Sequence, residues 1–495
     1  MVNNKSSLVF DFDHSFSREL EGFYSYCQSE PSPAPQFLFL NHALAEELGL
    51  DINLLGSDEG LSILSGNCLP ESSRPLAQAY AGHQFGGFSP LLGDGRALLL
   101  GEVLDLKKQR RDIQLKGSGR TPYSRNGDGK SALGPVLREY LISESMHTLC
   151  IPTTRSLAAV ATGEKVYRDQ VLPGGILTRV ASSHIRIGTF QYAASLRDDN
   201  KIKEIADYTI ARHYPEIINE EQPYLSLFDK VSHAQAFLVA RWMSVGFIHG
   251  VMNTDNMTVS GEAIDYGPCA FMDRYDPKTV FSSIDSQGRY AYMNQPIVLS
   301  WNLARLAETL LSLIDPLQDR AVEILTHKIE KIESIYEAYW LNEMRSKIGL
   351  SLEDVSDAAL IHDLLAMMEK EHTDFTLVFR GLAKSLIGNS NLVLELLSDH
   401  SEFESWMSRW RKRIQMENIA EETIANKMNR VNPIYIPRNH LVEEAINMAV
   451  VEGDMKLYSD LLTVLSHPFD EVAEWELYAL PAPLSDAAYK TFCGT

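Results

Sequence analysis

Three side chains whose oxygens could bind a metal or accept a proton stand out in the stretch HGVMNTDNMTVSGEAIDYG, residues 249–267. Asp255 and Asn256 are adjacent, and Asp265 follows shortly after them. Amide and carboxylate oxygens suit Mg²⁺, which takes few protein ligands and completes its coordination with phosphate oxygens. A further carboxylate beside such a site can take a proton from a hydroxyl group. The stretch is also typical of turns, so its chemistry depends on what the rest of the chain places beside it.

The same stretch has the spacing of a protein-kinase catalytic loop followed by its metal-binding loop. Those loops read H-R-D-x-x-x-x-N and then D-F-G. Here His249 and Asn256 occupy the two ends of the first pattern, and Asp265 begins DYG. Val251 stands where a kinase has its catalytic Asp, and valine cannot accept a proton. The stretch therefore indicates either an inactive kinase or an enzyme in which Asp255 does different chemistry.

A lysine and a glutamate occupy the positions that support such a site in kinases. Lys116 ends the apolar strand pattern RDIQLK, and Glu139 lies in the next helix on one stripe with Val136, Ile142 and Met146. A Lys–Glu pair between strand and helix would hold the ammonium group toward a phosphate. Taken alone, each residue is more typical of a solvated surface charge. The order of strand lysine, helix glutamate, HG…N loop and DYG favours the functional interpretation.

Further cations and glycine turns suit a triphosphate. Arginine binds phosphate through two parallel hydrogen bonds, and tight turns direct backbone N–H groups at anions. The expected cations are Arg96, Lys116, Arg179 and Arg186, and the expected turns are Asp94-Gly95 and Asp128-Gly129.

The composition is that of an acidic globular protein. The chain has 495 residues, 45% hydrophobic and 22% charged, and a net charge of −21. This length predicts more than one lobe, and the negative charge argues against nucleic-acid binding. We find no run of 18 apolar residues and no secretory signal, so we expect a cytoplasmic protein that does not bind membranes. Nothing in the sequence demands a dimer, so we expect a monomer.

The patterns predict an α+β, two-lobed protein-kinase-like fold with a helical extension. Strands are expected at 90–116 and 155–190, with a helix between them that Pro135 begins. After residue 195 the chain is mainly helical, and one predicted helix stops at Gly246. We expect an N-terminal lobe over residues 1–192, a catalytic C-terminal lobe over 193–330 and a helical extension over 331–495.

Several longer segments resemble the selenoprotein O family, and the resemblance covers essentially the whole chain. They are FDHSF near the N-terminus, LLGDGRA, DIQLKGSGRTPYSRNGDGKSALGPVLREYL, PTTRSLA, GFIHGVMNTDNMTVSGEAIDYGP and the terminal FCGT. The resemblance implies a kinase-like fold once classed as a pseudokinase. It also implies transfer of AMP from ATP to Ser, Thr or Tyr hydroxyls of proteins, with release of pyrophosphate and with the nucleotide inverted relative to kinases. Bacterial members are also associated with UMP transfer from UTP supported by Mn²⁺ in place of Mg²⁺.

The resemblance also implies a role for each matching residue. The catalytic base falls on Asp255, the metal ligands on Asn256 and Asp265, and the helix acid on Glu139. The nucleotide contacts fall on Gly93, Gly95, Arg96, Lys116, Asp128, Gly129, Arg179 and Arg186.

Two of the five cysteines flank the site in sequence. Cys269 lies four residues after Asp265, and Cys493 is third from the end. A disulfide between them would pin the tail near the site and make activity depend on redox state; two reduced thiols are the alternative. Some family members carry selenocysteine near the C-terminus, and Cys493 here puts any selenium-dependent property in doubt.

Two other functions remain open on the sequence. A phosphotransferase of the aminoglycoside-kinase kind also uses an HG…N loop, although it normally keeps an Asp at the position of Val251. A nucleotide-binding pseudokinase that only docks partners would bind ATP without turnover. The sequence does not name the protein substrates, and it does not choose between ATP and UTP or between Mg²⁺ and Mn²⁺.

Overall fold

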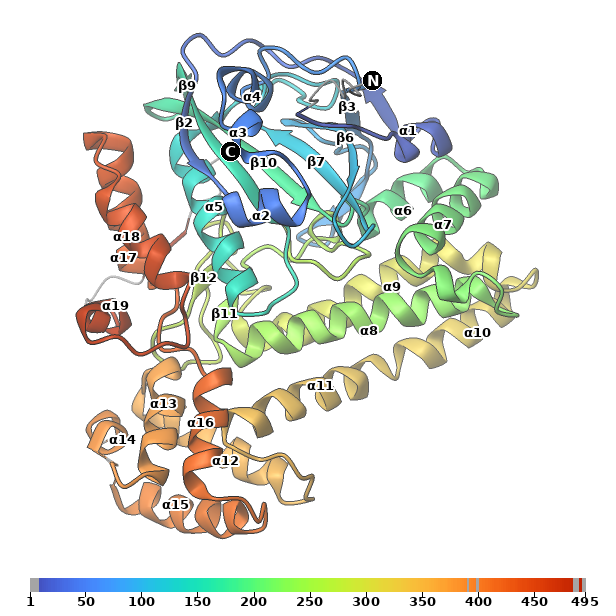
Figure 1. Cartoon of the computed structure of the whole chain (residues 1–495). Coiled ribbons are helices and arrows are strands. Elements are labelled where there is room, and N and C mark those ends of the chain that lie inside the picture. Colours follow the sequence, from blue (N-terminus) through green and yellow to red (C-terminus); the bar gives the residue numbers. More distant parts are fainter. Residues whose placement is uncertain (1–8, 390, 398–399, 484–488, 492–495) are drawn as a thin grey trace, which may run out of the picture.

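The computed structural model describes residues 9–389, 391–397, 400–483 and 489–491. Figure 1 shows a sheet-rich N-terminal part, a layer of long helices beside it and a separate group of helices farther along the chain. The fold is therefore mixed α and β, with the strands concentrated in the first 181 residues of the described chain.

An eight-stranded antiparallel sheet forms the centre of the N-terminal part. Its order is β1-β3-β6-β7-β10-β9-β2, and β8 pairs with β10 off this path. The strands are β1 (Tyr24–Tyr26), β2 (Gln36–Leu40), β3 (Leu76–Gln78), β6 (Ala97–Leu104), β7 (Arg110–Lys116), β8 (Ser131–Ala132), β9 (Arg155–Tyr167) and β10 (Val171–Ala181). Lys116 ends β7, as expected, and its register partners are Ala97 on β6 and Leu177 on β10.

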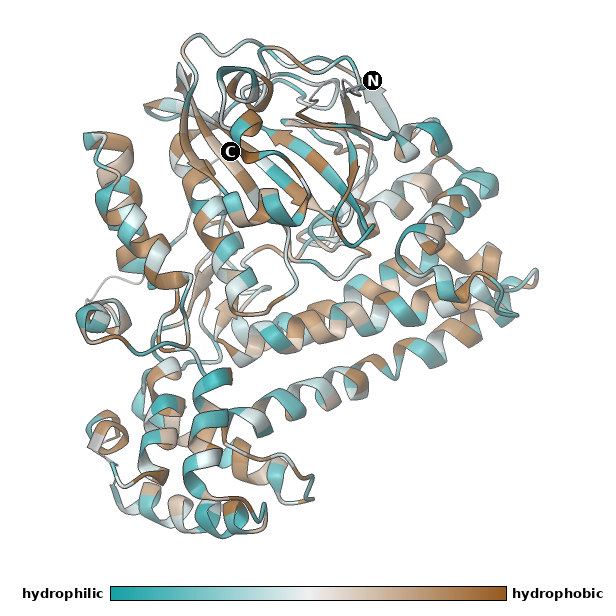
Figure 2. Cartoon of the chain, viewed as in Figure 1, coloured by the Kyte–Doolittle hydropathy of each residue, from teal (hydrophilic) through white to brown (hydrophobic). Residues whose placement is uncertain are grey.

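Helices cover both faces of this sheet, and Figure 2 shows apolar residues on its strands with polar residues between them, most of all in β7. Helix α5 (Leu133–Thr148) packs against β9 and β10. Residues of three short helices share a second hydrophobic cluster with β6, β7, β9 and β10; they are α2 (His42–Glu47), α3 (Ile52–Leu55) and α4 (Asp58–Leu64). Burial of the apolar side chains is the main stabilising contribution to the lobe. The polar side chains that β7 buries, among them Asp112 and Gln114, have hydrogen-bond partners.

The helical part begins after β10. The remaining helices are α1 (Ser15–Glu19), α6 (Ile187–Ser195), α7 (Asp199–His213), α8 (Pro223–Ser244), α9 (Gln295–Ile314), α10 (Gln318–Ile329), α11 (Ile332–Lys347), α12 (Asp357–Glu371), α13 (Phe375–Leu386), α14 (Asn391–Leu396), α15 (His400–Gln415), α16 (Glu421–Val431), α17 (Asn439–Asn447), α18 (Lys456–Leu465) and α19 (Glu476–Ala479). Helices α12 to α16 form the separate group, and α17 and α18 return to lie beside α5 (Figure 1).

The remaining elements are short strands and single helical turns. They are the hairpin β4 (Gly82–Gln84) and β5 (Gly87–Ser89), the pair β11 (Phe247–Ile248) and β12 (Ala270–Phe271), and the turns η1 (Pro215–Ile217), η2 (Thr254–Asn256), η3 (Tyr292–Asn294), η4 (Met448–Glu452) and η5 (Ala473–Trp475). Since β11 pairs with β12, the intervening residues form one loop that begins and ends at the same place.

The structure differs from two local expectations. Residues 182–190 are not strand, because β10 ends at Ala181 and Arg186 caps α6. An Asp-Gly pair is typical of hairpin turns, so the sequence also favours a hairpin at Asp94-Gly95. That pair does not connect two paired strands, because the turn between β6 and β7 lies at 105–109. The expected lobe boundary after residue 192 falls inside α6, and that after residue 330 falls between α10 and α11.

One described helix, Tyr292–Ile314, is long and apolar enough to cross a membrane by length and composition. Its α9 portion packs against α6, α8 and α10. It also carries Arg305 and Glu308, which form an ion pair at 2.8 Å. Long apolar helices of this kind are also found in the cores of helical folds.

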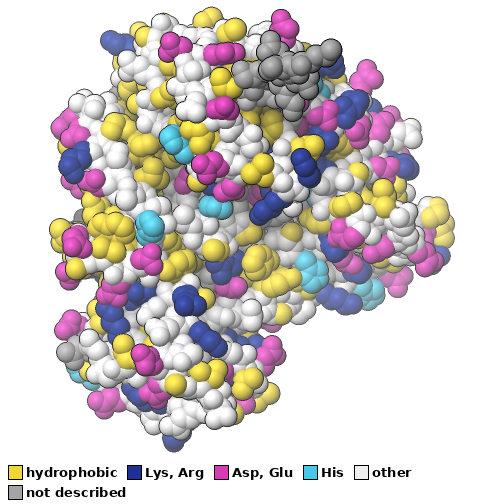
Figure 3. Space-filling view, viewed as in Figure 1, with side chains coloured by type: hydrophobic (Ala, Val, Ile, Leu, Met, Phe, Trp, Pro, Cys, Tyr) yellow, Lys and Arg dark blue, Asp and Glu magenta, His cyan; other side chains and the backbone are white. Residues whose placement is uncertain are grey.

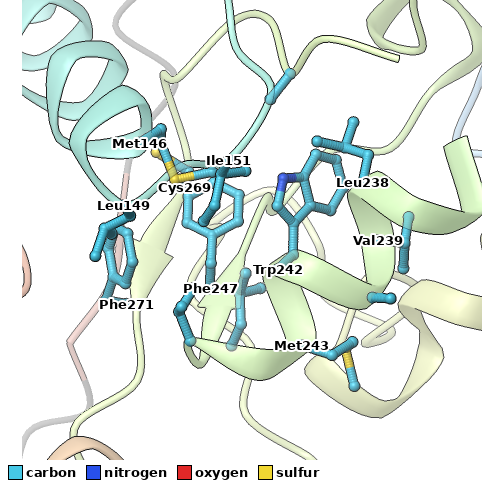
Figure 4. Packing of buried hydrophobic residues seen from close by; sticks show 14 of the residues in the cluster. Met146, Leu149, Ile151, Leu238, Val239, Trp242, Met243, Phe247, Cys269 and Phe271 are labelled. Atoms are coloured by element: carbon cyan, nitrogen blue, oxygen red, sulfur yellow. The ribbon is translucent and has the colours of Figure 1, made fainter. Parts of the chain in front are cut away.

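A hydrophobic core lies where α5, α8 and the β11–β12 pair meet (Figure 4). Met146 of α5, Trp242 of α8 and Phe247 of β11 lie in this cluster, and each is fully or almost fully buried. This core supports the predicted catalytic loop, because the loop starts directly after β11 and Phe247 of β11 belongs to the core.

Candidate active site

A cavity of about 540 Å³ lies between the sheet and the loop that joins β11 to β12. Of the residues expected at the site, those that line it are Gly95, Arg96, Lys116, Asp128, Gly129, Glu139, Arg179, Arg186, Asp255, Asn256 and Asp265. Val251 also lies on the wall, whereas Gly93 does not. The fold thus brings residues that are far apart in the sequence to one cavity of the size that small-molecule sites have.

Lys116 is held between two carboxylates. Its Nζ lies 2.6 Å from Glu139 Oε2 and 2.6 Å from Asp265 Oδ1. Glu139 reaches it because the apolar stripe of α5 is turned toward the sheet, and its side chain is 7% exposed. Burial by itself would raise the pKa of Asp265, but Lys116, Arg179 and Arg186 hold that pKa well below its usual range. Asp265 therefore keeps its negative charge.

Arg179 extends this charge cluster from the neighbouring strand. It lies opposite Gln114 in the β7–β10 register, and its Nη2 donates to Gln114 Oε1 at 2.7 Å. Its Nη1 donates to Asp265 Oδ1 at 2.8 Å and lies 3.2 Å from Glu139 Oε1. The side chain is almost fully buried, so its two ion pairs offset the cost of removing the charge from water.

Arg186 approaches the cavity from the start of α6. Its guanidinium stacks over the Tyr80 ring at 4.3 Å, and its Nη1 donates to the backbone oxygen of Asp255 at 3.2 Å. The carboxylates of Asp94 and Asp265 are 3.7 and 3.9 Å away. Its Nη2 is buried and has no hydrogen-bond acceptor among the described residues. A buried guanidinium with an unused donor is suited to receive a phosphate oxygen.

Gly93 and Gly129 are each required to be glycine for a different steric reason. At Gly93, whose φ is +67°, an added Cβ would lie 2.3 Å from Tyr123 Cγ, so this glycine makes room for an aromatic ring. At Gly129, whose φ is +69°, an added Cβ would lie 2.0 Å from the backbone oxygen of Gly119. Arg168 binds the adjacent Asp128 through two hydrogen bonds of 2.8 and 2.9 Å, which fixes this second turn on the cavity wall.

Asp255 lies on the cavity wall with one oxygen free. Gln84 Nε2 donates to its Oδ2 at 3.2 Å, and its Oδ1 is buried without a hydrogen-bond partner among the described residues. Burial raises the pKa of Asp255 to about 6, against the smaller opposing effect of Gln84. An oxygen that is desolvated, unpaired and more basic than usual is suited to accept a proton from a hydroxyl group.

Asn256 and Asp265 present oxygens suited to a divalent metal. Asn256 Nδ2 donates to the backbone oxygen of Val251 at 2.9 Å, which leaves its Oδ1 for another partner. The Oδ1 of Asp265 is taken by Lys116 and Arg179, while its Oδ2 has Arg186 no closer than 3.9 Å. No group of three or more His, Cys, Asp or Glu that could hold a metal occurs among the described residues. The donor set of one amide, one carboxylate and phosphate oxygens nevertheless fits Mg²⁺.

His249 supports the loop and does not face the cavity. It is fully buried, its Nε2 contacts the backbone oxygen of Ile264 at 2.9 Å, and Gln295 accepts its backbone N–H. Burial lowers the pKa of His249, so the ring is neutral and holds the two arms of the loop together.

Sequence reasoning missed Gln84, Tyr80, Gln114 and Arg168. They contact Asp255, Arg186, Arg179 and Asp128, respectively. Gln84 is 171 positions away from Asp255 in the chain. Only Gln114 had a local signal, because a polar residue in a strand buried on both faces needs a partner.

Cys269 lies in the hydrophobic core, not on the cavity wall (Figure 4). It is fully buried, its Sγ lies 3.3 Å from the backbone oxygen of Tyr266, and burial raises its thiol pKa to about 12. The adjacent Pro268 accepts a hydrogen bond from Thr491 Oγ1 at 2.6 Å. The chain therefore returns to the catalytic loop at Thr491. Cys493 follows two residues later and lies outside the described residues.

Comparison with known proteins identifies the family of this chain. Residues 7–466 match the family model for protein adenylyltransferase SelO. The chain is 57% identical to protein nucleotidyltransferase YdiU of Cereibacter sphaeroides over 490 residues, which cover 99% of this chain and 100% of the relative. The YdiU proteins of Rhizobium meliloti and Rhizobium etli are 53% identical over 490 residues and 52% identical over 498 residues. The match to the Rhizobium meliloti protein covers 98% of this chain and 100% of the relative. The match to the Rhizobium etli protein covers 100% of this chain and 99% of the relative. Since the family model and the relatives both span nearly the whole chain, this protein belongs to the SelO family of protein adenylyltransferases.

Proposed function

We propose that this protein transfers AMP from ATP to Ser, Thr or Tyr hydroxyls of other proteins and releases pyrophosphate, within a kinase-like two-lobed fold. The family to which the chain belongs is one of protein nucleotidyltransferases. The observation that carries the proposal is the position of the free carboxylate. The kinase base position holds Val251, while Asp255 lies on the cavity wall with an unpaired oxygen.

In this proposal the substrate hydroxyl meets the α-phosphorus of the nucleotide beside Asp255. Asp255 accepts the proton as the hydroxyl oxygen bonds to phosphorus, and the bond to the β-phosphate oxygen breaks. Pyrophosphate leaves with the negative charge that develops on that oxygen. Such charge is stabilised by fixed cations more strongly in the transition state than in the bound substrate. Lys116, Arg179 and Arg186 are those cations.

This assignment requires the triphosphate to enter inverted relative to a kinase. A kinase exposes the γ-phosphorus to its acceptor, whereas here the β- and γ-phosphates would lie against the cation cluster. Arg186 Nη2, which has no acceptor among the described residues, is the donor we assign to them. Arg96 and the turn at Asp128-Gly129 line the same cavity and would contact the rest of the nucleotide.

Asn256 and Asp265 would hold a Mg²⁺ or Mn²⁺ ion, which would neutralise phosphate charge when bound. Glu139 would keep the Lys116 ammonium in place by the ion pair at 2.6 Å. We propose ATP as the nucleotide and leave UTP as a second co-substrate for the same cavity. We further propose a cytoplasmic monomer that acts on proteins and not on nucleic acid. The net charge of −21 supports the exclusion of nucleic acid.

Two parallel incubations test the proposal. One uses ATP labelled at the α-phosphate and the other ATP labelled at the γ-phosphate, each with a bacterial lysate as protein acceptor. We expect protein-bound label only from the α-labelled ATP, and we expect Asp265→Ala to abolish it. Asp319→Ala is the matched control, because Asp319 is exposed on α10. Transfer of the γ-label would show a kinase instead. ATP binding without transfer of either label would show a non-catalytic nucleotide-binding protein.

We also propose that Cys269 and Cys493 form a redox-sensitive disulfide. The hydrogen bond between Thr491 and Pro268 supports it, because it brings the end of the described chain next to Cys269. Formation of the bond would require the core around Cys269 to open, since the thiol is buried and its pKa is about 12. Peptide mass spectrometry without reductant, after oxidant treatment, tests this proposal. The expected product is a cross-linked 269–493 peptide, and its absence would contradict the proposal.

A further inference from the structure

The hairpin β4–β5 is fastened to the catalytic loop at three consecutive residues. The backbone N–H of His83 donates to Thr254 Oγ1 at 2.7 Å, and that of Phe85 donates to Asn253 Oδ1 at 3.0 Å. Gln84, between them, donates to Asp255. We call the side of the hairpin that faces away from the catalytic loop its outer side. A molecule bound there would lie next to the Asp255 carboxylate.

The outer side of the hairpin continues into an exposed apolar surface on α9. Phe88 is 48% exposed and Ile297 is 68% exposed. His83 joins the two elements, because its ring lies 4.9 Å from Phe88 and 5.3 Å from Trp301. Ile297 and Trp301 are neighbours one helical turn apart. Isolated exposed apolar residues are common, whereas apolar side chains that adjoin one another on two elements favour an interaction site.

Two arginines sit on the same surface. The guanidinium carbons of Arg289 and Arg305 lie 4.8 and 5.2 Å from the centre of the Trp301 ring. The Nε atoms of both are buried without an acceptor among the described residues. Arg305 is already paired with Glu308 at 2.8 Å, so its charge is partly satisfied. Arg289 forms no ion pair within 4 Å among the described residues, so it is the cation left for a partner. In a chain of net charge −21, a cationic and aromatic surface is selective for an acidic partner. We call Phe85, Phe88, Ile297, Trp301, Arg289 and Arg305 the hairpin shelf.

We propose that the hairpin shelf is the docking surface for the protein substrate. It would accept an extended segment that carries a bulky apolar side chain and a carboxylate close to the hydroxyl that receives AMP. This inference rests on the proposed function. Phe85 argues for this occupant, because it belongs to the shelf and also lines the nucleotide cavity. A segment that covers the shelf thus reaches Asp255 without crossing another part of the surface.

The test compares two double variants with the wild-type chain. The shelf variant is Ile297→Asp/Arg305→Glu on α9, and the matched control is Val322→Asp/Arg320→Glu on the exposed surface of α10. Each pair exchanges one exposed apolar residue and one arginine. The probes are ATP labelled at the α-phosphate and the bacterial lysate protein that the wild type labels most strongly, purified as the acceptor. Calorimetry measures ATP binding, and light scattering measures the oligomeric state.

We expect the shelf variant to lose about tenfold in kcat/KM for the acceptor through a higher KM, as loss of a central interface anchor does. Its ATP affinity and melting temperature should match those of the control variant. Sites that the wild type modifies, mapped by mass spectrometry, should be enriched in neighbouring large apolar and acidic residues.

Three outcomes would overturn the inference. An unchanged KM in the shelf variant would show that the acceptor docks elsewhere. A wild-type dimer that the shelf substitutions dissociate would assign this face to a second copy of the chain. If the wild-type protein transfers no α-label, the proposed function is wrong and this inference fails with it. If the wild type transfers α-label but the shelf variant keeps its KM, only the docking inference fails.

Discussion

At the scale of single residues, the cavity holds two carboxyl groups with opposite tendencies. Lys116, Arg179 and Arg186 overcome burial at Asp265 and hold its pKa well below the usual range. At Asp255 burial prevails and raises the pKa to about 6. Neighbouring carboxyl groups whose pKa values are moved apart in this way usually have different roles. Asp265 suits a permanent charge, and Asp255 suits proton transfer.

The first prediction concerns Asp255 itself. Asp255→Asn keeps the shape of the side chain and removes its ability to accept a proton. We expect kcat for α-phosphate transfer to fall by about 10²- to 10⁴-fold, with the Kd for ATP within about twofold of wild type. Single-turnover transfer of α-label and calorimetry measure the two quantities. Asp276→Asn, at a half-buried position outside the cavity wall, should leave both unaltered, because an amide oxygen can still accept the backbone N–H of Lys278. Full activity of Asp255→Asn would exclude the proton-acceptor role.

The second prediction concerns Gln84, which donates to Asp255 Oδ2. Gln84→Leu removes this donor and should lower kcat by about tenfold, because the carboxylate is no longer oriented. Gln84→Glu should be worse, since it adds a like charge beside Asp255. KM for ATP should stay constant in both, which a general loss of structure would not produce. Gln170→Leu, at an exposed position, is the control. Equal kcat in all four proteins would contradict the positioning role.

At the scale of helices and strands, Lys347 is an exception to the pairing of buried charges. It ends α11 and lies with its Nζ 4.0 Å from the centre of the Phe379 ring of α13. Burial, and to a smaller extent the charge of Arg241, lower the pKa of Lys347 to about 7, against the opposing charge of Glu343. The contact between α11 and α13 is therefore less stable than an apolar side chain would make it.

The third prediction follows from proton linkage. The native pKa is below the value for an unfolded lysine, so between pH 7 and about 10.5 the unfolded chain binds the extra proton. The free energy of unfolding of wild type therefore rises across this range, relative to a variant without the ammonium group. Lys347→Met should be more stable at pH 7, and its advantage should shrink by up to about 1.4 kcal/mol per pH unit above that. Denaturant unfolding at several pH values measures this.

The control for Lys347 is Lys331→Met, at an exposed position where α10 meets α11. Its stability difference from wild type should not depend on pH between 7 and 9. A pH-independent difference for Lys347→Met would mean that the ammonium group remains charged in the native protein.

At the scale of the whole molecule, the last described helices complete the N-terminal part. Tyr458 of α18 donates to the backbone oxygen of Leu137 on α5 at 2.7 Å. Arg138 of α5 pairs with Glu443 of α17 at 2.7 Å and donates to the backbone oxygens of Gly267 and Cys269. Helix α5, which carries Glu139, is thus fixed by the sheet, the catalytic loop and the end of the chain together. On the face drawn in Figure 3, acidic and basic side chains are interspersed over the surface.

The fourth prediction tests this long-range support. Tyr458→Ala removes a fully buried ring and its hydrogen bond to α5. We expect a loss of about 3–5 kcal/mol in the free energy of unfolding, faster amide hydrogen exchange in α5 and weaker ATP binding. Tyr478→Ala, on the partly exposed α19, should change none of these by a comparable amount. Unchanged hydrogen exchange in α5 would show that the C-terminal helices do not support the site.

Local patterns in the sequence predicted much of the catalytic framework. The strand that ends in Lys116, the helix stripe that carries Glu139 and the helix before Gly246 are all found as expected. These features depend on residues a few positions apart, where the 2- and 3.6-residue periods, glycine and proline determine the outcome. The longer motifs also indicated the family, which the comparisons confirm.

Contacts between distant residues were decided only by the tertiary structure. Nothing near Gln84 indicates that it contacts Asp255, and nothing near Gly93 indicates that it makes room for Tyr123 rather than lining the cavity. Likewise, the helical pattern after residue 331 does not reveal that the end of the described chain packs on α5, because Arg138 and Glu443 are 305 positions apart. A periodic pattern shows which face of a helix or strand is buried, but the partner of that face depends on how the whole chain packs.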